Sequence, residues 1–137
     1  MRIESKVCRA EKDDQTIYNY ITNFNNFKNL VPADKVQDWE SGDDWCSFSV
    51  PPVGKTGIKV IDKEPHKLIK LTSTEQSQYD FTLWIQLKQV AENDTRMKLT
   101  MEAKLNPMMQ VMAKKPLKEF LDKLVEKIAA HHFESAE

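Results

Sequence analysis

The sequence predicts an α+β domain in which a curved antiparallel sheet of about seven strands wraps around one long C-terminal helix. Two observations support this fold class. Between residues 36 and 105, apolar and polar residues alternate with a period of two, and turn residues interrupt the alternation at short intervals. From residue 107 the apolar spacing becomes that of an amphipathic helix. A chain of 137 residues fits one domain, so we expect a single domain over residues 1–137.

The strands are expected to form an antiparallel meander with one face exposed to water, because short turns join consecutive segments. In the first strand, Ile3 and Val7 fall in the same alternating phase. The last two strands alternate most regularly and should form a hairpin that turns near Asn93. Strands are expected at residues 3–10, 36–41, 45–50, 57–63, 68–74, 80–90 and 95–105.

Two short helical segments are expected after the first strand. Asp13 or Asp14 can cap the first helix, because a short carboxylate accepts hydrogen bonds from the first free N–H groups. The apolar spacing predicts that this helix continues to about Phe24. A second short turn is expected at residues 27–31, and Pro32 opposes its continuation.

The long C-terminal helix is expected over residues 107–130, with Asn106 as its cap and Pro107 at its first position. Pro116 removes one main-chain hydrogen bond and should bend the helix. One continuous apolar stripe should face the sheet: Ala113, Leu117, Phe120, Leu121, Leu124, Val125 and Ile128. The apolar residues before the proline fall outside this stripe: Met108, Val111 and Met112.

Composition and charge exclude several classes of function. Twenty basic and twenty-one acidic residues give a net charge of −1, which does not predict nucleic-acid binding. The N-terminus has no apolar segment typical of a secretory signal, and no apolar run is long enough to span a membrane. We therefore expect a cytoplasmic protein without stable membrane insertion. Cys8 and Cys46 are expected to be reduced.

The sequence contains no pattern that predicts a metal site, a cofactor or a catalytic group. The run Gly54-Lys55-Thr56 matches the end of a phosphate-binding loop, but Ser49 stands where that motif requires glycine, and a strand follows instead of a helix. The histidines lack a carboxylate or cysteine at ligand spacing: His66, His131 and His132.

Several segments resemble one known superfamily. These are IESKV followed by TIYNYITNFNNFKNLVP, the pair of strands in GIKVIDKEPHKLIKLTS, and the ending LNPMMQVMAKKPLKEFLDKLVEKIAA. In this order, and over essentially the whole chain, they resemble the START-like superfamily, also called the helix-grip fold or the polyketide cyclase and lipid transport superfamily. The resemblance implies a cavity between the curved sheet and the long helix. Its members include lipid and sterol carriers, hormone receptors, quinone-binding proteins and aromatic cyclases.

The first functional interpretation is a non-catalytic carrier or sensor of a small hydrophobic molecule that is lipid-, quinone- or polyketide-like. Its candidate ligand-binding residues are aromatic or methionine side chains, which suit apolar ligands. They are Phe24, Phe27, Phe48, Phe81, Met97, Met101, Met108, Met109, Met112 and Phe120. Polar side chains that can orient such a ligand are Ser47 or Ser49, Ser73, Tyr79 and Gln110. An entrance is expected beside the three methionines of the C-terminal helix, with Phe27 opposite them.

Three alternatives remain open. The same residues can be ordinary core, as apolar stripes usually are. The protein can be a small cyclase- or dehydrase-type enzyme that acts on an aromatic or polyketide substrate. It can also be an interaction module with a filled cavity and with Trp39, Trp45 or Trp84 at a partner surface.

Overall fold

The computed structural model describes residues 1–30, 36–42, 44–51, 54–75 and 77–130, apart from the side chain of Asn25. Its elements follow the predicted order of strand, helix pair, meander and long helix. They are β1 (Arg2–Glu4), β2 (Cys8–Ala10), α1 (Asp14–Ile21), α2 (Phe24–Phe27), β3 (Gln37–Ser41), β4 (Trp45–Val50), β5 (Gly54–Glu64), β6 (Leu68–Ser73), β7 (Asp80–Ala91), β8 (Asp94–Lys104) and α3 (Pro107–Ala130).

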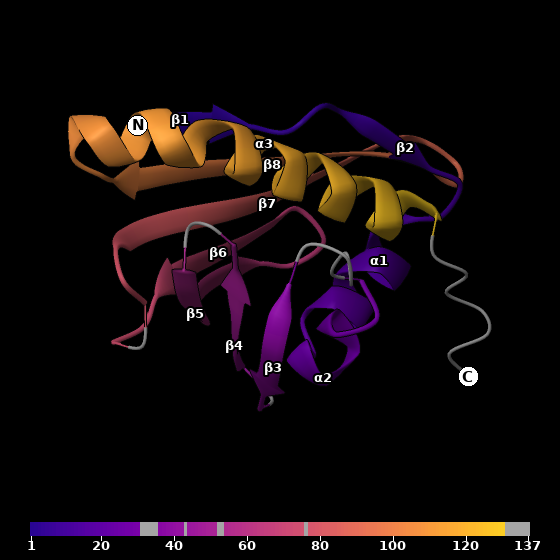
Figure 1. Cartoon of the computed structure of the whole chain (residues 1–137). Coiled ribbons are helices and arrows are strands. Elements are labelled where there is room, and N and C mark those ends of the chain that lie inside the picture. The colour runs from indigo at the N-terminus through magenta and orange to yellow at the C-terminus, as the bar shows by residue number, and fades with distance from the viewer. Residues whose placement is uncertain (31–35, 43, 52–53, 76, 131–137) are drawn as a thin grey trace.

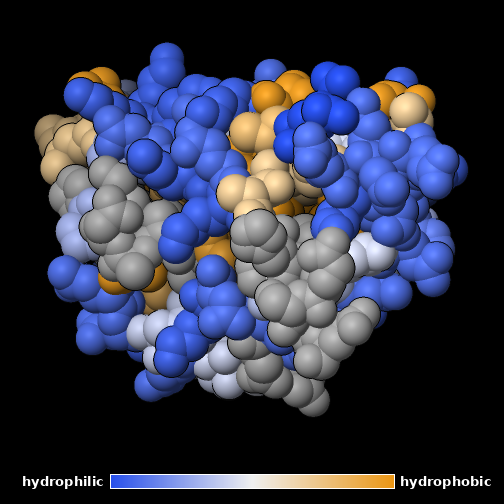
Figure 2. Space-filling model, turned by 90° about the vertical axis from the view of Figure 1, so that its right-hand side faces the viewer, coloured by the Kyte–Doolittle hydropathy of each residue, from blue (hydrophilic) through white to orange (hydrophobic). Residues whose placement is uncertain are grey.

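The strands form one antiparallel sheet of eight strands in the order β1-β8-β7-β6-β5-β4-β3, and β2 also pairs with β8. The sheet curves, and α3 lies across its concave side (Figure 1). Helices α1 and α2 lie at the end of the molecule where α3 ends (Figure 1). The surface at that end is mostly hydrophilic, with narrow hydrophobic strips between the polar side chains (Figure 2). The fold class predicted from the sequence is confirmed.

The predicted first strand is in fact two strands, β1 and β2. Glu4 pairs with Thr100 and Cys8 with Met97, so four steps on one strand match three on the other. Such an extra residue is a bulge, and it reverses which face the following side chains occupy. The prediction that Ile3 and Val7 share a face was therefore wrong: Ile3 is buried, whereas Val7 is 61% exposed.

Ser5 holds this break in place. Its hydroxyl accepts a hydrogen bond from the Leu99 N–H at 2.9 Å and donates one to the Lys6 carbonyl at 2.8 Å. Its own N–H donates to the Leu99 carbonyl at 2.8 Å. The Ser5 side chain is thus buried but fully hydrogen-bonded, which explains how a polar residue interrupts the strand inside the fold.

Asp13 caps α1, as predicted. Its carboxylate accepts hydrogen bonds from the N–H of Thr16 at 3.2 Å and from the Thr16 hydroxyl at 2.6 Å. The helix ends at Ile21 rather than near Phe24, because the hydroxyl of Thr22 donates to the Tyr18 carbonyl at 2.9 Å and closes the last turn. The second helix therefore begins at Phe24, earlier than expected. Val31, the last residue of the expected turn, lies outside the described residues.

Helix α3 has its predicted bounds and its predicted buried face. The Asn106 side chain accepts a hydrogen bond from the Met109 N–H at 2.8 Å, which caps the first turn. Pro116 lies inside the continuous helix, and a bend at this position stays a prediction. The buried residues are those of the expected stripe: Ala113, Leu117, Phe120, Leu121, Leu124, Val125 and Ile128. They belong to the same core as the inward-facing side chains of β7 and β8.

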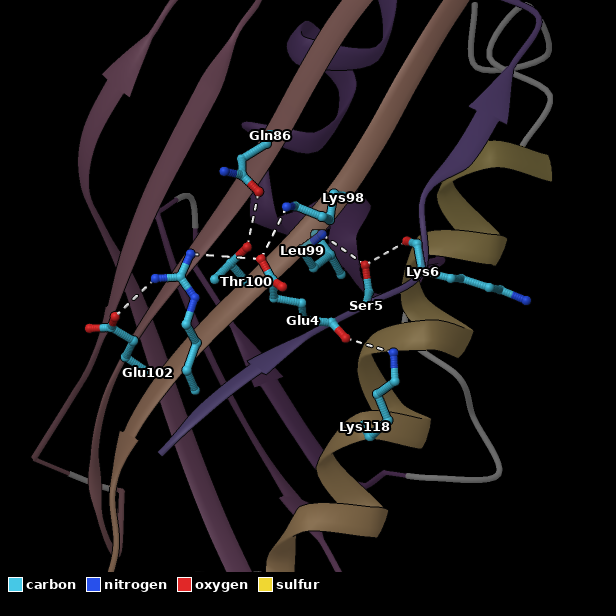
Figure 3. A network of polar contacts seen from close by, with 10 residues as sticks. Glu4, Ser5, Lys6, Gln86, Lys98, Leu99, Thr100, Glu102 and Lys118 are labelled. Carbon is cyan, nitrogen blue, oxygen red and sulfur yellow. Dashed lines mark hydrogen bonds and ion pairs between the residues drawn. The ribbon is translucent and has the colours of Figure 1, made fainter.

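Polar side chains fasten α3 to the outer edge of β1 (Figure 3). The Lys118 ammonium group donates to the Glu4 carbonyl at 2.6 Å, and the Asp122 carboxylate accepts from the Lys6 N–H at 2.8 Å. A strand edge otherwise exposes unpaired main-chain groups. The helix therefore covers part of an edge that would remain open to other chains.

Candidate ligand-binding site

Three aromatic rings connect the edge of the sheet to α3 across the concave side. Trp39 of β3 stacks on Phe48 of β4, with ring centroids 5.5 Å apart and 9° between the planes. Phe48 in turn stacks on Phe120 of α3, with centroids 5.5 Å apart and an angle of 28°. Phe48 and Phe120 are buried, and Trp39 is half-buried. These three residues are the aromatic stack.

A bulge in β3 brings Trp39 to this position. Gln37 pairs with Ser49 and Glu40 with Ser47, so three steps on β3 match two on β4. Asp38 lies at the bulge and has a φ of 56°, in the left-handed region that Asp tolerates better than most residues. The bulge leaves Trp39 beside Phe48, on the concave side, whereas from the sequence it was considered only for a partner surface.

Thr56 and Tyr79 add polar groups beside the stack. Thr56 of β5 is the cross-strand partner of Phe48 and is buried. Directly opposite residues of an antiparallel pair share one face, so the Thr56 side chain also faces the concave side. Tyr79 is 8% exposed, and its ring contacts Phe81 at a centroid distance of 5.3 Å. Burial raises the pKa of the Tyr79 phenol, and the nearby Thr56 hydroxyl acts in the opposite direction.

The hydroxyl of Tyr79 is buried and makes no hydrogen bond of good geometry with any described residue, although the Thr56 hydroxyl lies close enough to lower the pKa of the phenol. The indole nitrogen of Trp39 and the Ser47 hydroxyl are likewise buried without a hydrogen bond to any described residue. Most buried polar atoms in proteins are hydrogen-bonded, so each exception calls for an explanation. Ser47 precedes Phe48 on β4 and lies on the opposite face of the sheet. Tyr79 and Trp39 are therefore the two unpaired donors associated with the aromatic stack.

No protein-family model matches this chain, and no curated protein matches it. Solved structures match it over nearly the whole length. A START superfamily protein from Mycobacterium smegmatis has a TM-score of 0.72 at 14% identity, with 99% of both chains covered. Norcoclaurine synthase from Thalictrum flavum has a TM-score of 0.68 at 14% identity, with 96% of this chain and 87% of that chain covered. A conserved protein from Geobacillus kaustophilus has a TM-score of 0.70 at 15% identity, with 94% and 93% covered.

This chain has the START-like helix-grip fold. At these identities the likeness shows the fold alone, because one fold hosts many unrelated functions. The functional assignment of this helix-grip protein therefore depends on its own side chains.

The ten residues predicted to bind a ligand do not form one group. Seven of them are buried: Phe24, Phe27, Phe48, Phe81, Met97, Met101 and Phe120. Met109 is half-buried, whereas Met108 and Met112 are 74% and 51% exposed. Phe27 does not lie opposite these methionines, because α2 lies at the end of the helix-grip fold where α3 terminates, and the methionines lie at the start of α3 (Figure 1).

Most of the polar candidates have partners within the fold. The Ser73 hydroxyl accepts from the Phe81 N–H at 3.1 Å, and the Gln110 side chain donates to the Leu105 carbonyl at 2.9 Å. Ser49 alternates with Phe48 and lies on the opposite face of β4. Tyr79 is thus the candidate that keeps an unused donor on the concave side.

Sequence reasoning missed Thr56 and did not predict the contact between Trp39 and Phe48. Thr56 was considered only as part of a phosphate-loop match, because β5 was expected to begin at residue 57 rather than at Gly54. With the observed start, Thr56 falls in phase with Ile58, which would have assigned it to the apolar face. No local pattern signals the bulge that directs Trp39 inward, since it depends on pairing between strands.

Both cysteines are free thiols, Cys8 on β2 and Cys46 on β4. Burial raises the pKa of the Cys46 thiol to about 12, and it raises the pKa of Cys8 as well. Neither thiol is therefore activated as a nucleophile at neutral pH. Within the described residues no group of three or more His, Cys, Asp or Glu side chains could hold a metal ion. No helix of the described part is long and apolar enough to cross a membrane.

Proposed function

We propose that this protein binds a small, mainly apolar molecule that carries one hydrogen-bond acceptor, between the concave side of the sheet and α3. The observation that carries the proposal is the Tyr79 hydroxyl, which is buried beside Thr56, with Phe81 against its ring, and makes no hydrogen bond of good geometry among the described residues. Leaving a buried donor unpaired costs about 1–3 kcal/mol. An acceptor on a bound ligand would remove that cost.

The protonation state of the Tyr79 phenol determines whether it can donate a hydrogen bond to a ligand. Because burial raises the pKa of its phenol, the group is neutral at physiological pH and can donate its proton in a hydrogen bond. The acceptor on the ligand is then a carbonyl, ether or carboxyl oxygen. The lipid-, quinone- and polyketide-like classes all contain such an oxygen.

The remainder of the site supports an apolar body for the ligand. The aromatic stack is apolar, and the same core contains Met97 and Met101, whose side chains are flexible and polarisable. A site with an apolar lining and a few placed polar groups is the usual arrangement of small-molecule pockets. The Trp39 indole N–H is a second donor, and it suits a ligand with two oxygens such as a quinone.

Native mass spectrometry of the protein purified from its own host tests this proposal, together with titration by two probes, 2-methyl-1,4-naphthoquinone and dodecanoic acid. We expect a co-purified mass that dissociates on denaturation, or saturable binding of at least one probe with one site per chain. Absence of both would reject the proposal and favour a filled interior and an interaction module. Chemical conversion of a co-purified molecule by the protein would favour the cyclase-type enzyme.

A further inference from the structure

The start of α3 presents an apolar surface to solvent. Met108 is 74% exposed, Val111 is 83% exposed and Met112 is 51% exposed. Their spacing of three and four residues places them on one face of the helix, opposite the buried Ala113 and Leu117. Large apolar side chains exposed in this way are uncommon when they lie side by side. We call these three residues the α3 patch.

Positive charge surrounds the α3 patch. Residues 103–118 contain four lysines and no aspartate or glutamate. Lys114 and Lys115 are exposed and form no ion pair with any described residue. Acidic residues return on α3 only from Glu119 onward, where three of them alternate with two lysines, so only the first half of the helix is uniformly basic.

A groove of about 560 Å³ extends this surface toward β1. Ile3 and Val111 contribute its apolar lining, and the rest is mainly basic. The Lys118 side chain at this groove is fixed by the Glu4 carbonyl and by Asp122, as Figure 3 shows for Glu4. The full lining is Arg2, Ile3, Glu4, Val111, Lys114, Lys115 and Lys118.

We propose that the α3 patch and its lysines dock the protein reversibly on the surface of an anionic lipid bilayer. The three apolar side chains enter the boundary between headgroups and acyl chains, and α3 lies in the plane of the interface. Lys114 and Lys115 contact anionic headgroups while their aliphatic stems cover apolar surface. The proposal does not depend on the internal ligand site.

Charge and shape favour a bilayer over other occupants. A second copy of the chain would bring Lys114 and Lys115 of both copies together in a symmetric interface, where like charges repel. A protein partner is held best where large side chains fill matching pockets, whereas Met108 and Met112 project from the exposed face of a helix. A fluid bilayer needs no matching shape and supplies the negative charge.

Co-sedimentation of the full-length chain with vesicles tests the proposal. One set of vesicles contains phosphatidylcholine alone, and the other contains equal amounts of phosphatidylcholine and phosphatidylglycerol. We expect about tenfold more binding, or greater, to the anionic vesicles at low salt, and loss of that difference at high salt. Equal binding to both vesicles, or binding to neither, would overturn the proposal.

Two variants separate the apolar and the charged contributions. Met108→Ser combined with Val111→Ser and Met112→Ser should reduce binding to anionic vesicles by about tenfold or more. Lys114→Glu with Lys115→Glu should do the same. The matched control is Lys88→Glu with Val90→Ser, two exposed sites on β7, which should bind like the unchanged protein. All substituted positions are exposed, so the variants should have melting temperatures similar to that of the unchanged protein. Variants that bind anionic vesicles as well as the unchanged protein does would contradict the proposal. A concentration-dependent dimer that only the triple serine variant abolishes would also contradict it.

Discussion

Trp39 on the edge strand β3 lies nearly parallel to Phe48 on β4, with ring centroids 5.5 Å apart and 9° between the ring planes. Because Phe48 also stacks on Phe120, the β3 edge of the sheet and the long helix are joined through one aromatic stack. The bulge at Asp38 makes this contact possible, since it leaves Trp39 opposite Phe48. Bulges often direct a side chain next to a binding or active site.

Leu124 lies at the centre of the buried stripe of α3 and is fully buried. Leu124→Ala should lower the free energy of unfolding by about 2–5 kcal/mol, because it removes apolar contacts and leaves a cavity. Denaturant unfolding measures this change. Lys123→Ala, at the exposed neighbouring position, serves as the control and should change the free energy by less than about 0.5 kcal/mol. A similarly small effect of Leu124→Ala would mean that another face of α3 packs against the sheet.

Ser5 stabilises the break between β1 and β2 through a buried hydrogen bond from the Leu99 N–H. Ser5→Ala leaves that N–H without its partner, which should cost about 1–3 kcal/mol of unfolding free energy. Val7→Ala, two residues away at an exposed position, should cost less than about 0.5 kcal/mol. Equal and small effects of both changes would show that the hydroxyl does not hold the bulge.

Cys8 and Cys46 should differ in reactivity toward a thiol reagent in the folded protein. Cys46 is fully buried with a pKa raised to about 12, so it should react only after unfolding. Cys8 is half-buried and should react first. A thiol count with and without denaturant measures both. Two equally fast thiols in the folded protein would contradict this assignment, and so would a disulfide between them.

The segments with the strongest periodicity were predicted most accurately. In the hairpin of β7 and β8, every inward-facing residue from Phe81 to Leu87 is buried, and the turn contains Asn93 with a φ of 50°. The bounds of α3 were also correct, because its cap and its apolar stripe are both local signals. Such elements depend on residues close together in the sequence, so their pattern is sufficient.

The features that define the candidate site depend on contacts between distant segments. The bulges beside Ser5 and at Asp38 each add one residue to a strand, and neither leaves a compositional signal. The helix phase correctly placed Met108 and Met112 outside the core stripe, but it did not show that they point to solvent rather than toward a ligand entrance. The unused donor on Tyr79 depends on the tertiary packing around its hydroxyl, which the sequence pattern does not predict.

The substitution Tyr79→Phe tests the central claim most directly, with Tyr18→Phe as the matched control. Tyr18 is a buried tyrosine of α1 whose ring contacts His66 and none of the three rings of the aromatic stack. For a quinone or fatty-acid probe that binds the unchanged protein, Tyr79→Phe should weaken binding about fivefold to tenfold, the value of one hydrogen bond of about 1 kcal/mol or slightly more. Without ligand the same variant should be equally stable or slightly more stable, because it removes an unpaired buried hydroxyl. Unchanged affinity in Tyr79→Phe, or an equal loss in Tyr18→Phe, would contradict the account.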